Sequence, residues 1–131
     1  MGEACKLSCG HCSYNQEVFL GIGFQYINLI SILEWYREDV GRQRIRAFMN
    51  EKDTTFDCFD GLYVCQKCRY LLNETYLHMR SDSQTYTNRY VCPCCTAPMP
   101  SRPLDHLQNT ALDCPDCGQE KLVVNFYMDW D

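Results

Sequence analysis

Eight of the eleven cysteines in this 131-residue chain have the spacing of metal ligands, because they form four Cys-x-x-Cys pairs. The pairs are Cys9/Cys12, Cys65/Cys68, Cys92/Cys95 and Cys114/Cys117. Two cysteines three positions apart in a tight turn, a zinc knuckle, can direct both sulfurs at one point. Two knuckles then complete a tetrahedral Zn²⁺ site with Zn–S distances of about 2.3 Å. The pattern predicts two Zn²⁺ ions in closed four-thiolate sites, which stabilise the fold and leave no position for a substrate.

The lengths of chain between the knuckles indicate which of them share an ion. Eighteen residues separate the last two pairs, within the usual range for a zinc ribbon, whereas fifty-two separate the first two. We predict sequential pairing, with the longer segment inserted between the knuckles of one ribbon. Site 1 would consist of Cys9, Cys12, Cys65 and Cys68, and site 2 of Cys92, Cys95, Cys114 and Cys117. The alternative is a cross-brace, in which the first pair joins the third and the second joins the fourth.

The fourth knuckle has the most specific context, Cys-Pro-Asp-Cys-Gly. Pro115 presets the turn, and Gly118 can adopt a positive φ just after the second sulfur. In the third knuckle the spacing favours Cys95 over Cys94 as the partner of Cys92. The sequence thus identifies a preferred ligand pair in each turn.

The remaining cysteines and the histidines are predicted not to bind metal, because four thiolates already complete each site. Cys5 and Cys58 are expected to be small buried hydrophobic residues. The histidines are His11, His78 and His106. Whether the extra cysteines have a redox role, and what His11 does, stays open.

One knuckle has the same sequence as a redox motif, Cys9-Gly10-His11-Cys12, found in disulfide isomerases. That chemistry requires the first cysteine at the N-terminus of a helix after a strand of a thioredoxin βαβ unit. Too few residues precede Cys9 for such a unit, and the residues that follow lead into an expected strand at 17–20. No nucleophile–base set or open metal site can be assembled either, so we predict that the protein is not an enzyme.

Residues 25–52 are predicted to be helical. A stripe of apolar residues at helical spacing runs through Leu29, Ile32, Leu33, Tyr36 and Val40. It restarts out of phase at Ile45, Phe48 and Met49, which predicts two helices with a break near residues 39–41. Strands are expected at 17–20, 63–64, 70–72, 75–80, 89–91 and 122–130. The last has one wholly apolar face, which is expected to pack on the core.

These elements predict a small α+β, metal-stapled protein. It would have two zinc-ribbon β lobes, with the helical insertion at about residues 25–52 in the first. The expected domains are 1–80, an N-terminal zinc ribbon with the helical insertion, and 81–131, a C-terminal zinc ribbon. Small lobes of this kind need a metal because each buries too little apolar surface alone.

The charge of the chain bears on its partners. The formal net charge is −5, and eight ligand thiolates with two Zn²⁺ ions would lower it to about −9. An acidic protein lacks the basic surface on which non-specific nucleic-acid binding rests. Four arginines, Arg37, Arg42, Arg44 and Arg46, are interleaved with acidic residues and fit either a salt-bridged helix surface or a local cationic patch. No stretch is apolar enough for a membrane span, and the first fifteen residues lack the apolar segment of a signal peptide, so we expect a cytoplasmic protein.

The chain resembles an uncharacterised family of small bacterial double zinc-ribbon proteins. The likeness covers most of the chain and rests on Met1-Gly2-Glu3, the first knuckle, Leu20-Gly21-Ile22-Gly23-Phe24, Leu62-Tyr63-Val64-Cys65 and a final Cys-Pro-x-Cys-Gly ribbon ending in Trp130-Asp131. The resemblance implies the same eight cysteine ligands and no particular activity. The chain departs from the family pattern at Cys5 and Cys94. A more distant architectural likeness is to the two-ribbon subunits and cleavage factors of RNA polymerases, although the 52-residue insertion departs from their pattern.

We expect a non-catalytic zinc-binding protein-interaction module, an adaptor or regulator. Closed metal sites, an acidic balance and nine tyrosines support this expectation, since tyrosine is enriched at protein interfaces. The alternative is a nucleic-acid-binding or transcription-associated zinc ribbon. It would use the four arginines with Lys52 against phosphates and a tyrosine-bearing strand for stacking. The two hypotheses differ in the kind of partner, and the sequence indicates neither the identity of the partner nor the oligomeric state.

Overall fold

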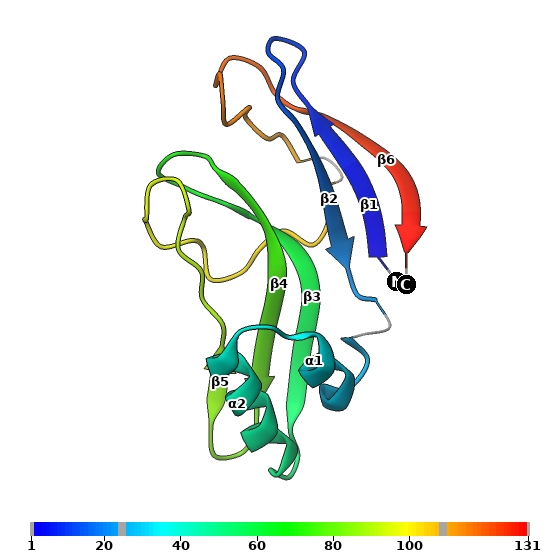
Figure 1. Cartoon of the computed structure of the whole chain (residues 1–131), viewed down its shortest axis with the longest axis vertical. Coiled ribbons are helices and arrows are strands. Elements are labelled where there is room, and N and C mark those ends of the chain that lie inside the picture. Colours follow the sequence, from blue (N-terminus) through cyan, green and yellow to red (C-terminus); the bar gives the residue numbers. More distant parts are fainter. Residues whose placement is uncertain (1, 24–25, 108–109, 131) are drawn as a thin grey trace.

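The computed structural model describes residues 2–23, 26–107 and 110–130 and shows a small α+β protein (Figure 1). Six antiparallel strands form one sheet in the order β5-β4-β3-β2-β1-β6, and two helices lie between β2 and β3 in the chain. The elements are β1 (Gly2–Ser8), β2 (Asn15–Gly21), α1 (Leu29–Trp35), α2 (Asp39–Met49), β3 (Thr55–Val64), β4 (Leu71–Arg80), β5 (Thr85–Thr87) and β6 (Val123–Trp130). No helix among the described residues is long and apolar enough to cross a membrane.

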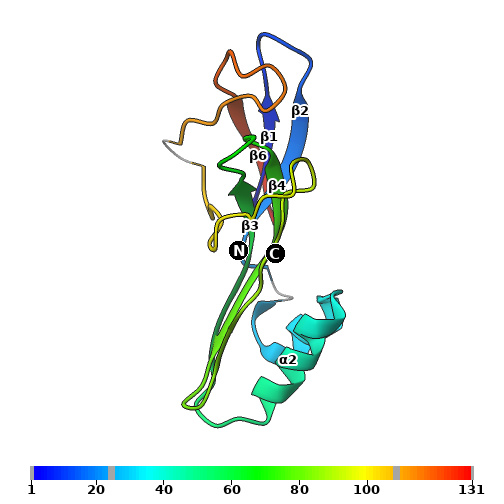
Figure 2. The ribbon, with the colours of Figure 1, turned by 90° about the vertical axis from the view of Figure 1, so that its left-hand side faces the viewer.

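The sheet consists of two halves that meet over a short seam. One half is β6-β1-β2 and the other is β3-β4-β5, and the register between β2 and β3 has a single pair, Gly21 with Asp60. The first and last strands are neighbours, with Gly2 opposite Trp130. Strands from the two expected domains, 1–80 and 81–131, therefore lie side by side. Figure 2 shows the helices beside the β3-β4-β5 half only.

The helical section forms two helices, as predicted, although the break lies at residues 36–38 rather than 39–41. The side chain of Glu38 accepts hydrogen bonds from the backbone N–H groups of Val40 and Gly41, which starts α2. The guanidinium of Arg42 donates to the backbone carbonyls of Leu33 and Tyr36, which satisfies the end of α1. A reciprocal pair of caps thus fixes the turn between the helices.

Part of the predicted apolar stripe of the helices is buried against the sheet. Ile32, Ile45 and Phe48 pack with residues of β3 and β4 in one hydrophobic cluster. Val40 is 56% exposed, so its place in the predicted stripe is wrong. The extended backbone at the break resets the phase of α2, and this turns Val40 away from the sheet.

The C-terminal strand forms as predicted, but only its first part packs on the core. Leu122 is buried and Val124 packs against the same cluster, which also contains Leu7 and Leu20. Phe126 and Met128, on the same predicted face, are 46% and 48% exposed. The prediction that this face packs on the core is therefore wrong beyond Val124. β6 is the edge strand among the described elements, and a register shift against β1 leaves Tyr127 outside the regular ladder and turns Met128 to the face opposite Phe126.

Three other segments differ from the expected elements. β1 was not predicted, although it is the partner of both β2 and β6. Residues 89–91 form no extended ladder, since only Val91 pairs there, with Pro98. Leu104 forms an isolated antiparallel bridge with Leu62, so this part of the chain crosses the end of β3.

Candidate metal centres and the neighbouring cleft

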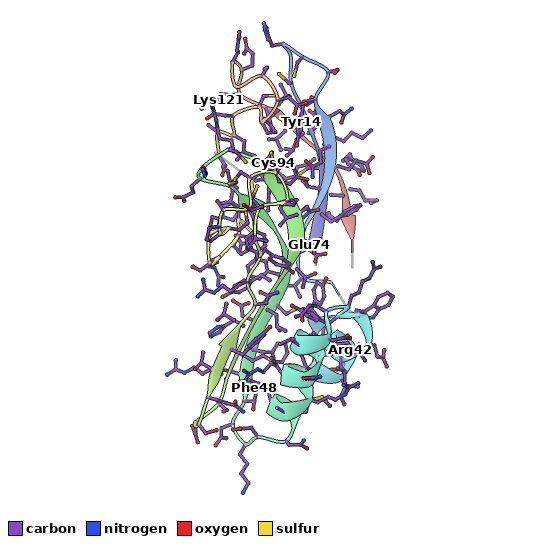
Figure 3. The ribbon with its side chains drawn as sticks, turned by 60° about the vertical axis from the view of Figure 1, so that its left-hand side comes forward. Tyr14, Arg42, Phe48, Glu74, Cys94 and Lys121 are labelled. Atoms are coloured by element: carbon purple, nitrogen blue, oxygen red, sulfur yellow. The ribbon has the colours of Figure 1, made fainter. Side chains whose placement is uncertain are left out.

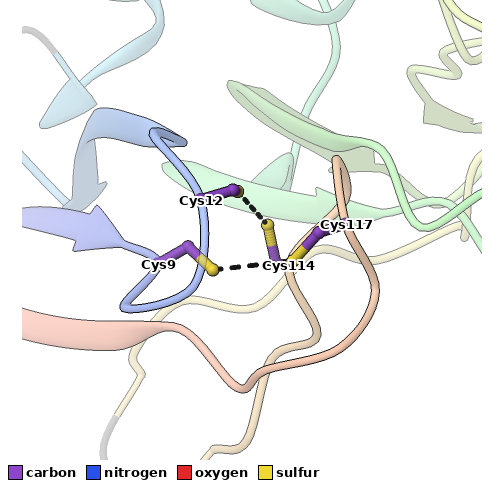
Figure 4. Close-up of side chains that lie close together, drawn as sticks. All are labelled: Cys9, Cys12, Cys114 and Cys117. Carbon is purple, nitrogen blue, oxygen red and sulfur yellow. Dashed lines mark hydrogen bonds between the residues drawn. The ribbon is translucent and has the colours of Figure 1, made fainter.

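The eight predicted cysteines form two separate groups of four sulfurs. The outer set is Cys9, Cys12, Cys114 and Cys117, and the inner set is Cys65, Cys68, Cys92 and Cys95. Within each set all sulfurs lie within 4.8 Å of one another. Figure 4 shows the outer set, in which a turn from each end of the chain contributes two sulfurs. The structure therefore confirms that the eight cysteines can hold two metal ions.

The pairing of the knuckles corrects the prediction. The first knuckle joins the fourth and the second joins the third, which is neither the sequential arrangement nor the cross-brace. The reason is the sheet. The first knuckle is the turn between β1 and β2, and β6, which follows the fourth knuckle, pairs with β1. The second knuckle is the turn between β3 and β4, and the chain after β5 returns beside it.

The sulfur positions fit a tetrahedral thiolate site. The Cys12–Cys114 and Cys9–Cys117 sulfurs are 3.5 and 3.7 Å apart in the outer set. In the inner set the corresponding distances are both 3.5 Å. Four sulfurs about 2.3 Å from one Zn²⁺ ion would lie about 3.8 Å apart, whereas a disulfide requires about 2.05 Å. The spacing matches ligands around a common ion and not bonded sulfurs.

Three of the knuckles share the same backbone conformation and hydrogen bond. The residue just after the second cysteine has a left-handed conformation, with φ of 68° at Arg69, 63° at Thr96 and 66° at Gly118. Its backbone N–H donates to the carbonyl of the first cysteine of the knuckle, 2.9 Å away in each case. The positive φ predicted for Gly118 is confirmed. Arg69 and Thr96 occupy the same position at a steric cost that glycine would avoid.

Backbone donors favour the thiolate form of a ligand. The N–H of Cys68 lies 3.5 Å from the sulfur of Cys65, and this hydrogen bond lowers the pKa of the Cys65 thiol to about 6. Similar N–H contacts reach Cys92 from Cys94 and Cys95, at 3.4 and 3.5 Å. In these two knuckles the turn thus favours the thiolate form of the first cysteine.

A polar contact connects the two metal centres. Arg69, in the second knuckle, lies 3.6 Å from the carboxylate of Asp113, which precedes the fourth knuckle. Lys121 also donates to Asp113, and this hydrogen bond is the main reason that the Asp113 pKa is lowered. All three side chains are partly exposed, so the contact contributes little to stability.

The other cysteines lie outside both sets. Cys5 and Cys58 are buried, as predicted. Burial raises the pKa of the Cys5 thiol to about 11 and raises that of Cys58 further. Cys94 is exposed, and Figure 3 places it at the knuckle end of the molecule. Among the described residues, no histidine belongs to either group of candidate ligands.

A cleft that the sequence did not reveal lies between the helices and the sheet. Its volume is about 760 Å³, and it extends from Phe19 on β2 to Tyr86 on β5. Six aromatic side chains line it: Phe19, Tyr26, Trp35, Tyr36, Tyr86 and Tyr90. Figure 3 shows Glu74, another lining residue, midway along the molecule. Trp35 lies outside the predicted apolar stripe of the helices. A large apolar side chain on the other side of the helix was the one feature of the sequence that pointed to the cleft.

The polar wall of the cleft is held by hydrogen bonds. Tyr26 donates to Asp60 at 2.6 Å, and Thr75 donates to the same carboxylate oxygen at 2.9 Å. Burial raises the pKa of Asp60 despite these donors. Burial also raises the pKa of Glu74, with a further contribution from the nearby Asp60 carboxylate and an opposing one from Arg37. This wall of the cleft is therefore preformed and contains two carboxyl groups.

One side chain joins the two halves of the sheet beside this cleft. The amide oxygen of Asn73 accepts from the backbone N–H of Phe19 at 2.8 Å, and its amide nitrogen donates to the Phe19 carbonyl at 2.9 Å. The same nitrogen lies 2.9 Å from the carbonyl of Gly61. The Asn73 side chain thus takes the place of a neighbouring strand where β2 and β3 diverge.

The four arginines do not form one free patch. Arg42 is bound to the end of α1, and the guanidinium of Arg44 lies 5.7 Å from the centre of the Tyr86 ring. Arg37 lines the cleft near Glu74.

No family model, curated protein or solved structure matches the chain.

Proposed function

We propose that the protein is a non-catalytic interaction module in which two structural Zn²⁺ ions hold the knuckles and the aromatic cleft binds a segment of a protein partner. The observation that carries the proposal is the cleft itself, a preformed hollow with six aromatic side chains in its wall. Aromatic residues dominate the energetics of protein interfaces because they offer a large rigid apolar area with polar groups at the edge.

The metal part of the proposal rests on the donor sets. Four thiolates at tetrahedral spacing are the ligands of structural zinc, and each set uses all four coordination positions. Such sites require reduced cysteines, which fits a reducing compartment such as the cytoplasm. We expect two Zn²⁺ ions per chain by native mass spectrometry with elemental analysis. A metal content of one or none after purification in zinc would contradict this part.

The binding part of the proposal rests on exposure at the rim. Trp35 is 66% exposed and Phe19 is 40% exposed, although both are large apolar side chains that line the cleft. The cleft also contains two carboxyl groups, those of Asp60, which is half-buried, and Glu74, which is exposed. A partner segment with apolar side chains and a basic residue would cover the rim and pair with these carboxyl groups.

A photo-crosslinking experiment tests the site. A benzoylphenylalanine is introduced in place of Trp35, and a matched control carries it in place of Val91, which is 63% exposed and does not line the cleft. Irradiation of native extract is expected to give a discrete protein adduct only for the first variant, and Tyr86→Ala is expected to remove it. Equal adducts at both positions, or none at the cleft, would refute the proposal.

The arrangement supports the nucleic-acid alternative less well. Two of its four arginines already have internal partners, Arg42 at the end of α1 and Arg44 over Tyr86. Binding through phosphates would weaken steeply with salt. Fluorescence anisotropy with mixed RNA and DNA at low salt distinguishes the two functions, and we expect no binding.

A further inference from the structure

Asp60 is the carboxyl group of the cleft that the surrounding fold holds most firmly. It lies on β3 where the two halves of the sheet meet, between Gly21 of β2 and Thr75 of β4. Tyr26 donates to its Oδ1 atom at 2.6 Å, and Thr75 donates to the same atom at 2.9 Å. Asp60 also lines the cleft. Because both internal donors contact Oδ1, the second oxygen, Oδ2, is the one that a ligand in the cleft can use.

The charged side chains of the cleft favour a cation at this oxygen. Three carboxylates and two guanidiniums line it, which leaves one net negative charge: Glu38, Asp60, Glu74, Arg37 and Arg89. Both oxygens of Glu38 already accept backbone N–H groups at the start of α2. Arg37 lies near enough to Glu74 to oppose the rise of its pKa. Within the described ranges, Asp60 has no ion-pair partner, so its charge is the one that a ligand would balance.

The aromatic side chains of the cleft suit the stem of a long basic side chain. Phe19 and Trp35 are exposed at the rim, and the Tyr26 ring reaches Asp60 through its hydroxyl group. Methylene groups can pack on such rings while the charged end of the same side chain contacts a polar atom. The faces of the rings also attract a cation. A lysine or an arginine fits this description equally well, and the hydrogen bonds of Asp60 distinguish them.

We infer that the cleft binds an unmodified lysine side chain of the partner segment, with the ammonium group on Oδ2 of Asp60. A guanidinium binds a carboxylate best as a fork, with one N–H group on each oxygen. Two donors already fill the lone pairs of Oδ1, so this fork is blocked. An ammonium is a compact donor and needs only Oδ2. The inference rests on the proposed function and names the residue that the cleft selects.

Methylation separates the hydrogen bond to Asp60 from the attraction of the rings. Trimethyllysine keeps the charge and the stem of lysine but has no N–H donor. A cage of aromatic rings alone would therefore bind the trimethylated side chain as well as lysine or better. A site built on Oδ2 of Asp60 would bind it more weakly, because the oxygen would lose its donor.

An NMR titration of the zinc-loaded chain tests this selectivity. The probes are the Nα-acetyl methylamides of lysine, arginine and trimethyllysine. The lysine probe is expected to shift the amides of Asp60 and Thr75 and the indole N–H of Trp35, with a dissociation constant of about 1 mM for a ligand of this size. The arginine and trimethyllysine probes should bind at least about fivefold more weakly.

Asp60→Asn is the decisive variant because it preserves the internal hydrogen bonds. Its amide oxygen can still accept from Tyr26 and Thr75, which places an NH₂ group where Oδ2 stood. The lysine probe should then bind about tenfold more weakly or less. Asp82→Asn is the matched control, since it removes the same charge from an exposed turn outside the cleft and should bind the probe like the wild type. Zinc content and far-UV circular dichroism show that both variants are folded.

The photo-crosslinking experiment separates this inference from the proposed function. The adduct formed from position 35 should disappear when Asp60→Asn is combined with the crosslinker and persist with Asp82→Asn. An adduct that keeps its yield in Asp60→Asn overturns the inference and leaves the proposed function intact. Arginine or trimethyllysine probes that bind as tightly as lysine overturn the inference in the same way. The absence of any adduct refutes the proposed function, and the inference with it.

Discussion

Replacing Asn73 with alanine should loosen the joint between the two halves of the sheet. The Asn73 side chain makes three hydrogen bonds to backbone groups, two with Phe19 and one with Gly61. Each hydrogen bond contributes about 0.5–1.5 kcal/mol net. The two bonds to Phe19 are exposed, so water can replace them after the substitution, and the total should lie near the lower half of the sum. We expect a loss of about 2 kcal/mol.

The joint has little else to compensate for that loss. Between β2 and β3 the strand register contains only the pair Gly21 and Asp60. Urea denaturation at saturating zinc should therefore show a lower midpoint and a shallower transition, because the halves begin to unfold separately. Native-state exchange of the Phe19 amide should become about thirty-fold faster, which is 2 kcal/mol expressed as an equilibrium constant.

Two further variants make this test specific. Asn125→Ala removes an exposed amide from the surface of β6 and should change stability by less than about 0.5 kcal/mol. Asn73→Asp keeps the acceptor for the Phe19 N–H but turns an oxygen toward two carbonyls, so it should be at least as destabilising as alanine. If Asn73→Ala leaves both the unfolding free energy and the Phe19 exchange rate unchanged, the role assigned to this side chain is wrong.

Three more outcomes follow from the metal centres and the buried groups. In the zinc-loaded protein Ellman's reagent should modify only Cys94, since Cys5 and Cys58 are buried with raised pKa values; rapid reaction of a second thiol while both metals stay bound would contradict this. Cys117→Ser should cause the loss of one metal ion, measured by native mass spectrometry. In amide exchange, β1, β2 and β6 should lose protection while β3 and β4 stay protected. Loss of both metals would show that the centres are interdependent. Burial raises the pKa of Asp60 above the usual 3.8, so the folded state binds this proton more tightly and wild-type stability falls as pH rises through the raised value. Asp60→Asn should therefore gain stability relative to wild type over that pH range in urea titrations at saturating zinc, and a flat difference would refute the assignment.

The sequence predicted which cysteines form each knuckle but not which knuckles share an ion. The spacing of Cys92 and Cys95 and the glycine at 118 report on a single turn, and the structure has both as predicted. Which turns meet depends on strand order. β1 has only seven residues, and Ala4, Cys5 and Leu7 are its only apolar side chains, so its sequence pattern was too weak to predict a strand. Without β1 there was no reason to place the end of the chain beside its beginning.

The cleft was beyond sequence reasoning for a related cause. Its walls come from β2, the turn between the helices, β4 and the segment after β5. None of these segments carries a motif, and the aromatic residues converge only through the packing of α1 and α2 on the sheet. Periodicity found the buried side of the helices, whereas Trp35, on their other side, had no predicted neighbour.

In the sequence, the ligands of the inner set lie between the two knuckles of the outer set, and this sets the order in which the two metal centres assemble during synthesis. The inner set is complete once Cys95 has left the ribosome, and the hairpin of β3 and β4 can then close around its ion. The outer set must wait for Cys117, and β1 stays without β6 until residues 123–130 have been synthesised. During that interval the first knuckle is a two-thiolate site with incomplete coordination. A nascent chain would therefore hold one ion firmly and present a second, half-built site to the metal carriers and oxidants of the cell.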